Sequence, residues 1–400
     1  MTANYYADNL ELHLERISLR KEKSPIVIYF GRPNSFSDNS KYLYLDACAN
    51  AYGMSPFWAT TNQPIINLLG SFGLPVLPLT GQMDMALQVL VKAAVVVYCV
   101  NPNEAMLDTR VRAAVAGAFK VQLWHGLFAN NLDLQLTDQA SLSDRGLAYQ
   151  LYGAAEVDAV LSPSAQHDQH FSAAFGAPHL IRAGYPRNEV LFRHPTVLEQ
   201  LGAMPECDLS AVSSGPRVLF CPTFSKIGQP VWLEEWLLAL FREIHVVLGV
   251  TTFIKPHPFE AKIARAFTSI TDGVYVIPAV ADIYPSLRMF DLMISDYSSL
   301  MDDFHLTGKP ILILQSPERA HLREGYLFAE LHQERVAGIV EPADLLESIR
   351  RALAGDFVGK GTASDYSTTQ EGASAQINQF LASVVEERCS RRPELIDLTQ

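Results

Sequence analysis

The chain has 400 residues, of which 48% are hydrophobic and 18% are charged, and its formal net charge is −12. This composition is typical of a folded protein with sizeable cores and excludes an intrinsically disordered chain. The acidic balance argues against a nucleic-acid-binding surface and against general attraction to anionic lipid, so an anionic ligand needs a local site built from dipoles, hydroxyls, histidines and a few cations.

The N-terminal segment, residues 1–24, lacks the apolar core of a secretory signal peptide. The five cysteines are scattered without metal-binding spacing, which favours reduced thiols. The most apolar window, residues 85–100, is interrupted by Lys92 and is better explained by a helix followed by a buried strand than by a membrane span. We therefore expect a cytoplasmic protein, and peripheral contact with the cytoplasmic face of the inner membrane stays open.

Short β-rich runs alternate with amphipathic helical stretches through the first half of the chain. The expected strands are residues 25–30, 55–60, 75–79, 95–100, 121–125, 159–164 and 179–184. The expected helices include residues 39–52, 85–94, 103–119 and 143–156. This alternation predicts βα units and a parallel sheet that is covered by helices on both faces.

Between Pro186 and Arg217 the alternation breaks into a stretch rich in Pro, Ser and Gly, which is typical of a linker. A second series of strands is expected at residues 217–223, 251–257, 274–278, 291–295 and 311–314. We predict an α/β fold with two doubly wound, Rossmann-like domains and a C-terminal helix. The predicted boundaries are 1–190 for the first domain, 191–216 for the linker, 217–372 for the second domain and 373–400 for the C-terminal helix and tail.

Ligands of open α/β sheets bind beyond the carboxyl ends of the strands, so polar residues just after strands are candidate site residues. Asp296-Tyr297-Ser298-Ser299 ends a buried strand and precedes a helix that we expect from Ser299 to Leu306. Free backbone N–H groups and serine hydroxyls at such a helix start favour a phosphate. Taken alone, an ordinary serine N-cap is the simpler explanation of this fragment.

Two histidines also follow expected strands. His257 lies between two prolines directly after Lys255, and an imidazole held in this way can donate to a phosphate. His125 stands in the sequence Trp124-His125-Gly126 and is a candidate general base for a hydroxyl nucleophile. A histidine in a surface turn and a packed core histidine are the plain alternatives.

A fourth polar strand end is Pro222-Thr223, followed by Ser225 and Lys226, which offers hydroxyl and cation contacts to a phosphate or is a plain βα loop. The chain has no Walker A motif, no Rossmann glycine fingerprint and no zinc-protease or nucleophile-elbow motif. It also lacks a convincing DxD pair, and we expect Asp302 and Asp303 to face solvent on a helix. No metal ligand set and no required cofactor are predicted, and dependence on a divalent metal stays open.

Together these pieces resemble the CDP-glycerol:glycerophosphotransferase family, which builds teichoic acids and related phosphopolyol capsule polymers. Nine segments match in the family's order and span about residues 25–340. They are FSDNSKYLY (36–44), LWHG (123–126), LSPS (161–164), GYPRNEVL (184–191), LFCPTF (219–224), KPHP (255–258), DIYPSLRMFDLMISDYSSLMDDF (282–304), GKPILIL (308–314) and REGYLFAE (323–330).

The resemblance implies a glycosyltransferase-B-like pair of domains. The second would hold a CDP-glycerol or CDP-ribitol donor, and the first would hold a phosphopolyol or lipid-linked saccharide acceptor. An acceptor hydroxyl would attack the distal phosphorus of the donor and expel CMP. Catalysis of this kind is mostly positioning and electrostatic preorganisation.

The resemblance also implies residue roles. Ser298 and Ser299 would donate to the donor pyrophosphate, and Asp296 would order their turn. His257 would stabilise charge on departing CMP, and His125 would be the base or would position the acceptor. The further substrate-binding residues that the resemblance implies are Trp124, Gly126, Pro222, Thr223, Lys255, Tyr297, Arg323 and Gly325.

One departure concerns the acceptor side, because family members often carry a lysine where this chain has Asn130-Asn131. Two other functions stay open. The same fold serves glycosyltransferases and epimerases that use a UDP- or CMP-sugar, and a nucleotide-binding protein without catalysis would share the donor motifs. Retention of both His125 and His257 argues weakly against the non-catalytic alternative.

Overall fold

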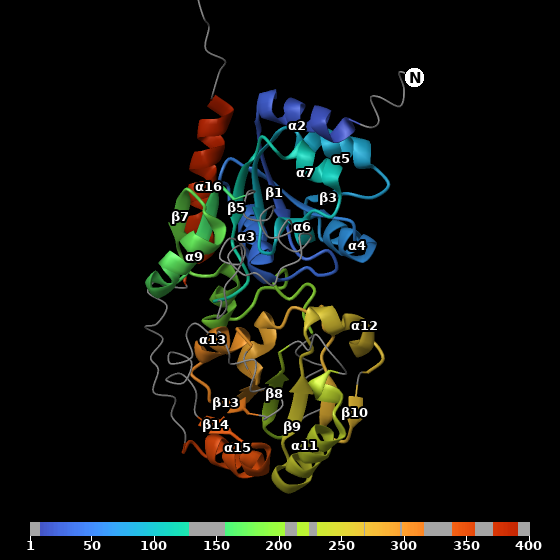
Figure 1. The fold of residues 1–400 in the computed structure, drawn as a ribbon, viewed down its shortest axis with the longest axis vertical. Coiled ribbons are helices and arrows are strands. Elements are labelled where there is room, and N and C mark those ends of the chain that lie inside the picture. Colours follow the sequence, from blue (N-terminus) through green and yellow to red (C-terminus); the bar gives the residue numbers. More distant parts are fainter. Residues whose placement is uncertain are drawn as a thin grey trace, which may run out of the picture. The chain divides into compact units, whose positions relative to one another are not determined.

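The computed structural model describes residues 9–127, 157–204, 214–223, 230–267, 269–296, 298–315, 338–356 and 371–390. The chain divides into two compact units. The first comprises residues 1–125, 132–187 and 368–400, and the second comprises residues 126–131 and 188–367. Within the described residues each unit contains a seven-stranded sheet with helices around it (Figure 1).

The sheet of the first unit is parallel throughout and has the strand order β3-β2-β1-β4-β5-β6-β7. Its strands are β1 (Ser24–Phe30), β2 (Ser55–Thr60), β3 (Val76–Pro78), β4 (Ala93–Tyr98), β5 (Phe119–Gln122), β6 (Ala159–Ser162) and β7 (His179–Arg182). All six residues of β4 are buried, as expected for a central strand of a sheet with both faces covered. Every strand predicted in this half of the chain is present.

The helices of the first unit differ from prediction in several places, and the helix predicted over residues 143–156 lies outside the described residues. They are α2 (Leu10–Arg20), α3 (Asp38–Ala49), α4 (Gln63–Ser71), α5 (Met83–Leu90), α6 (Pro102–Ala105), α7 (Thr109–Ala114), α9 (Asp168–Phe175) and α16 (Ala373–Ser390). The single helix predicted over residues 103–119 is wrong, because Asp108 accepts from Arg110 N and starts a new helix. Helix α5 also ends four residues before predicted, because Ala93 already pairs in β4.

The C-terminal helix α16 is part of the first unit, although the second unit precedes it in the sequence. It packs on α3, β1 and β4. The side chain of Asn378, which is fully buried, accepts from Tyr29 Oη at 3.2 Å and donates to Leu43 O at 3.0 Å. These bonds satisfy the buried amide, so Asn378 fixes the position of α16 against α3 and β1.

The sheet of the second unit has the order β10-β11-β9-β8-β12-β13-β14, and among its described strands only the β10–β11 pair is antiparallel. Its strands are β8 (Arg217–Cys221), β9 (Thr251–Ile254), β10 (Ser269–Thr271), β11 (Val274–Val276), β12 (Leu292–Ser295), β13 (Ile311–Leu314) and β14 (Gly338–Val340). Every residue of β9, β12 and β13 is buried, and so is every residue of β8 except Arg217.

The helices of the second unit are α11 (Glu235–Leu248), α12 (Ala261–Ala264), α13 (Leu300–His305) and α15 (Leu345–Leu353). Helix α11 buries Leu237, Phe241 and Ile244 against the sheet and ends at Gly249, whose φ of 65° is the left-handed conformation that favours glycine. Short 3-10 helices lie at Val231–Leu233, Pro258–Glu260, Tyr284–Met289 and Pro342–Asp344. None of the helices in the described ranges is long and apolar enough to span a membrane.

Both sheets place a strand-order reversal beside polar loops. Counted in chain order along the parallel strands, the first sheet has the order 3-2-1-4-5-6-7, and the second sheet without β10 has the order 3-2-1-4-5-6. Both contain the doubly wound 3-2-1-4-5-6 arrangement, so the predicted α/β fold class is confirmed. The order reverses between β1 and β4 in the first unit and between β8 and β12 in the second. A ligand crevice is expected beyond the carboxyl ends of these strand pairs.

Candidate functional site

His125 follows β5 in the first unit, and its ring is held by the neighbouring strand end. Its Nδ1 lies 2.9 Å from the carbonyl oxygen of Cys99, directly after β4. A carbonyl can only accept, so Nδ1 carries the proton and donates it. In the neutral ring Nε2 therefore holds a lone pair. This tautomer is the one that a general base requires.

The surroundings of His125 keep its imidazole neutral. Burial lowers the pKa of His125 to about 4, and the charges of Arg32 and Arg187 add to the lowering, whereas Asp38 opposes it. At neutral pH the ring is uncharged and can accept a proton at Nε2.

The turn that carries His125 is strained and is held by side chains. Trp124 has a φ of 54°, in the left-handed region that non-glycine residues rarely adopt. The Nδ2 of Asn39 donates to Trp124 O at 2.8 Å, and Nη1 of Arg187 donates to His125 O at 2.8 Å. The Trp124 and His125 rings lie 4.2 Å apart. Both carbonyls of the turn are thereby fixed, and Gly126 completes it with a φ of 154°.

Asp38, Asn39 and Arg187 form the support of this turn, and sequence reasoning gave them no role. Arg187 Nη1 lies 2.6 Å from Asp38 Oδ1, and the Arg187 side chain is only 3% exposed. The backbone N–H of Arg187 donates to Asn39 Oδ1 at 3.3 Å. The matched segments 36–44 and 184–191 contain these residues, so the sequence signal was present, but only the fold shows that the two segments meet.

In the second unit the loops after β8 and β12 are joined by side chains. Asp296 accepts from the backbone N–H of Thr223 at 2.7 Å and from its hydroxyl. Ser295 donates from Oγ to Cys221 O at 2.6 Å and accepts from Ser298 N at 3.3 Å. Asp296 therefore links its loop to the one that follows Pro222, a link that the sequence did not reveal. The role of Ser295 was also missed.

The two serines after β12 keep hydroxyl hydrogens available for a ligand. Ser298 Oγ accepts from Leu300 N at 3.3 Å, which leaves its own hydrogen to donate. Ser299 precedes α13 but makes no side-chain cap bond. The simple capping explanation therefore does not account for Ser299. Because α13 has only six residues, hydroxyls and backbone N–H groups matter here more than a helix dipole.

His257 follows β9 and is held in the opposite tautomer to His125. Its Nδ1 accepts from Phe259 N at 3.3 Å, so in the neutral ring the proton lies on Nε2. Glu260 accepts from His257 N at 3.3 Å and from Trp232 Nε1 at 2.9 Å, which completes a capping box. His257 therefore presents an N–H donor at Nε2. Nearby in sequence, the Lys255 ammonium donates to Ala279 O at 2.6 Å and adds a positive charge beyond β9.

The expectation that Asp302 and Asp303 face solvent is wrong. Each is only 1% exposed, because α13 is buried along Met301 to Phe304. Asp303 accepts from Tyr284 Oη at 2.7 Å and from Asn188 Nδ2 at 2.8 Å. Asp303 thus joins three segments of the second unit.

Several predicted positions lie outside the described residues: Ser225, Lys226, Tyr297, Arg323, Gly325 and Asn130-Asn131. In the parts of the chain that the structure describes, no group of three or more His, Cys, Asp or Glu side chains is arranged to hold a metal ion. The candidate site residues that the structure describes offer hydroxyls, imidazoles, a lysine and backbone N–H groups.

A comparison with models of protein families identifies the family of this chain. The family model described as CDP-glycerol:poly(glycerophosphate) glycerophosphotransferase matches residues 13–350. The chain belongs to this family. It is an enzyme of the CDP-glycerol glycerophosphotransferase type, as the sequence resemblance implied. No curated protein sequence matches it.

Solved structures confirm the fold. One structure of the wall teichoic acid polymerase TagF is 16% identical, with a TM-score of 0.71, and the match covers 97% of this chain and 98% of that chain. A variant of that polymerase soaked with CDPG is 15% identical, with a TM-score of 0.70 and coverage of 97% and 98%. A putative UDP-N-acetylglucosamine 2-epimerase from Listeria monocytogenes is 14% identical, with a TM-score of 0.54 and coverage of 94% and 99%.

Proposed function

We propose that this glycerophosphotransferase moves the glycerol phosphate unit of CDP-glycerol to a hydroxyl of a teichoic-acid-like acceptor and releases CMP. The observation that carries the proposal is the pair of opposite tautomers. His125 offers a lone pair at Nε2, and His257 offers an N–H at Nε2. A reaction that removes a proton from a nucleophile and places negative charge on a leaving phosphate needs one group of each kind.

The proposed step is one displacement at phosphorus. The acceptor oxygen forms a bond to the distal phosphorus of CDP-glycerol while the bond from that phosphorus to the bridging oxygen breaks. The acceptor proton passes to His125 Nε2, and the bridging oxygen leaves with CMP. His257 donates a hydrogen bond from Nε2–H to the negative charge that develops on the leaving CMP. The ammonium of Lys255 stabilises the same charge electrostatically.

The donor phosphates are assigned to the loops beyond β8 and β12. Ser298 and Ser299 supply hydroxyl donors, and Asp296 keeps Thr223 in place through its two accepted bonds. Each hydrogen bond to a charged phosphate contributes about 1.5–3 kcal/mol. Trp124, Gly126, Pro222, Tyr297, Arg323 and Gly325 stay predicted substrate contacts.

The finer assignments of substrate, biological role and location also stay predictions. They are CDP-ribitol as a donor, a lipid-linked saccharide as an acceptor, a role in capsule polymers, a cytoplasmic location and peripheral contact with the inner membrane. The domain boundaries read from the sequence are proposed in the same sense. A UDP-sugar enzyme is the second candidate function, because an epimerase structure shares the fold.

The test is mass spectrometry of products from CDP-glycerol, CDP-ribitol and UDP-N-acetylglucosamine, each with a short phosphopolyol acceptor. We expect CMP together with an acceptor that is heavier by one glycerol phosphate. Thermal-shift measurements with CDP and UDP provide an independent check of cytidine selectivity. Turnover of the UDP-sugar with no reaction of either CDP-polyol would overturn the proposal.

A further inference from the structure

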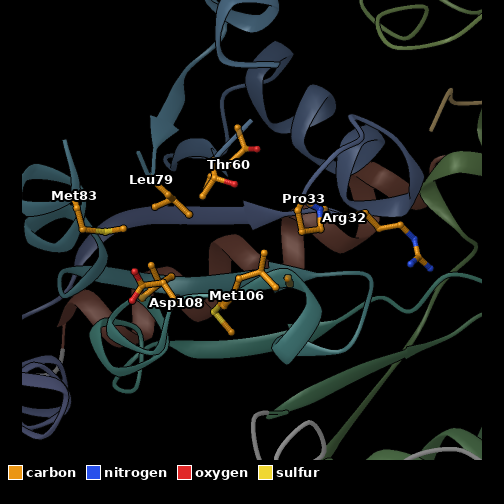
Figure 2. A pocket seen from close by; sticks show the side chains of 13 residues that line it. Arg32, Pro33, Thr60, Leu79, Met83, Met106 and Asp108 are labelled. Atoms are coloured by element: carbon orange, nitrogen blue, oxygen red, sulfur yellow. The ribbon is translucent and has the colours of Figure 1, made fainter. Parts of the chain in front are cut away.

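Two features of the described residues lie outside the roles assigned so far. The first is a pocket in the first unit, where Arg32 and Asp108 stand among mainly apolar lining residues (Figure 2). Arg32 pairs with Glu104, and Asp108 pairs with Arg110. Apolar walls and charges that are already paired do not specify an occupant, so this pocket by itself indicates no class of ligand. The second feature is an exposed aromatic side chain in the second unit.

That side chain is Phe259, which lies beside a candidate site residue. It is 62% exposed and belongs to the short 3-10 helix that follows β9. The centroid of its ring lies 4.9 Å from that of the His257 ring. The exposed phenylalanine and tryptophan side chains in the described part of the second unit are Phe192, Trp236 and Phe259. Among these three, only Phe259 has a ring contact with a candidate site residue.

The fold of this loop does not require an aromatic side chain at position 259. The backbone N–H of Phe259 donates to His257 Nδ1 at 3.3 Å, and any residue except proline would supply that donor. The loop is held by Glu260, which accepts from His257 N and from Trp232 Nε1. The Phe259 ring therefore adds exposed apolar surface to a backbone that is already fixed.

The arrangement of the two rings suits a planar base. The rings are tilted by 53° and are not stacked face to face, so Phe259 keeps aromatic surface exposed to solvent. Nucleobases stack on aromatic side chains of this kind. In a nucleotide a single ribose separates the base from the phosphate. A base that stacks on Phe259 therefore leaves its phosphate close to His257, which presents Nε2–H to the leaving nucleotide in the proposed reaction.

We propose that Phe259 is the stacking platform for the nucleobase of the donor. This inference rests on the proposed function in one respect, because it uses the assignment of the leaving nucleotide to His257. An aromatic ring stacks on every base, since each base has a π face. Phe259 therefore contributes affinity for the nucleoside part of the donor and does not itself select cytosine over uracil.

Calorimetric titration of the full chain tests this binding without turnover. The probes are CDP, UDP and inorganic pyrophosphate, which carries the phosphates without a nucleoside. Phe259→Ala should weaken the binding of CDP roughly tenfold, the effect of losing one base–aromatic stack, and should leave the affinity for pyrophosphate unchanged. Where UDP binds, its affinity should fall by the same factor.

Two further variants make the test specific to the ring. Phe259→Trp retains an aromatic face and should bind CDP at least as tightly as the unmodified protein. The fluorescence that the new tryptophan adds should be quenched by CDP and not by pyrophosphate. Phe192→Ala removes another exposed phenylalanine of the same unit, so it is the matched control and should change neither affinity.

A role of Phe259 that acts only through His257 gives a different result. In that case Phe259→Ala would weaken the binding of pyrophosphate as much as that of CDP, and this outcome overturns the inference. An unchanged affinity of Phe259→Ala for CDP overturns it as well, and so does the absence of binding of both nucleotides to the unmodified protein.

The outcomes also separate this inference from the proposed function. Tighter binding of UDP than of CDP, with the same loss in Phe259→Ala, would keep the platform and remove the CDP-glycerol assignment. Turnover of CDP-glycerol with an unchanged KM in Phe259→Ala would keep the assignment and remove the platform. In an active enzyme Phe259→Ala should raise KM for CDP-glycerol roughly tenfold and leave kcat unchanged, because the base stacks equally in the ground state and the transition state.

Discussion

Arg187 holds the backbone of the candidate base: its guanidinium Nη1 lies 2.8 Å from the carbonyl oxygen of His125. The same nitrogen lies 2.6 Å from Asp38 Oδ1. One buried cation thus fixes the turn and at the same time affects the proton affinity of the imidazole. The charged side chains that affect the pKa of His125 are Arg32, Arg187 and Asp38. Arg32 is itself paired with Glu104.

The first prediction concerns the pH dependence of the reaction. A base whose pKa is about 4 stays unprotonated above that pH, so kcat/KM should fall only as the pH decreases through about 4. Arg187→Gln removes a charge that lowers this pKa, so the acid limb should move to higher pH. Asp38→Asn removes a charge that raises it, so the limb should move to lower pH.

Opposite shifts distinguish an electrostatic role from simple loss of structure. Damage to the turn would lower the activity of both variants without shifting the acid limbs of their pH profiles in opposite directions. Arg182→Gln, in an exposed ion pair with Asp168 of the same unit, is the matched control and should leave the profile in place. Shifts of Arg187→Gln and Asp38→Asn in the same direction would contradict the prediction.

The second prediction follows from the two tautomers. A glutamine side chain can donate an N–H but cannot accept a proton as a base. His257→Gln should therefore keep at least tenfold more activity than His257→Ala. His125→Gln should be as inactive as His125→Ala, with a loss of about 10²–10⁴-fold in kcat.

Single-turnover release of CMP measures these rates, and calorimetric titration with CDP-glycerol shows whether the donor still binds. The His125 variants should bind the donor with unchanged affinity, because the proposal places the donor on the second unit. Equal activity of His257→Gln and His257→Ala would remove the N–H donor role from His257.

The third prediction concerns Glu260, which is 5% exposed and accepts from both Trp232 Nε1 and His257 N. Glu260→Ala leaves the buried indole N–H without its acceptor, so the free energy of unfolding should fall by about 1–3 kcal/mol. Urea unfolding followed by tryptophan fluorescence measures this change. Glu243→Ala, at an exposed position of α11, should leave the unfolding midpoint unchanged.

The fourth prediction concerns Asp303. Asp303→Ala leaves the Tyr284 hydroxyl and the Asn188 amide without an acceptor, so it should destabilise the protein by about 2–4 kcal/mol. Tyr284→Phe removes only one donor and should cost less. Equal denaturation midpoints for Asp303→Ala and the unmodified protein would mean that the aspartate is solvated after all.

The amino-acid sequence by itself determined the α/β class, the strand-end positions of His125, His257 and Thr223, and all of the described strands except the short β10 and β14. These features depend on neighbouring residues, because an apolar run and the polar residues that follow it stand next to each other in the sequence. Such reasoning did not predict that Asp108 divides one predicted helix into two. It also did not predict the burial of Asp302 and Asp303, because helical spacing alone does not say which face packs inward.

Only the tertiary structure decided which proton each histidine carries and which side chains hold it. Cys99, whose carbonyl oxygen accepts from His125 Nδ1, lies 26 residues away in the sequence. Arg187, which donates to the carbonyl oxygen of His125, lies 62 residues away. Such contacts depend on the order in which the strands pair, and strand order is a property of the folded sheet. For this reason the sequence placed His125 and His257 directly after strands, whereas the fold supplied the orientation and the charge environment of their rings.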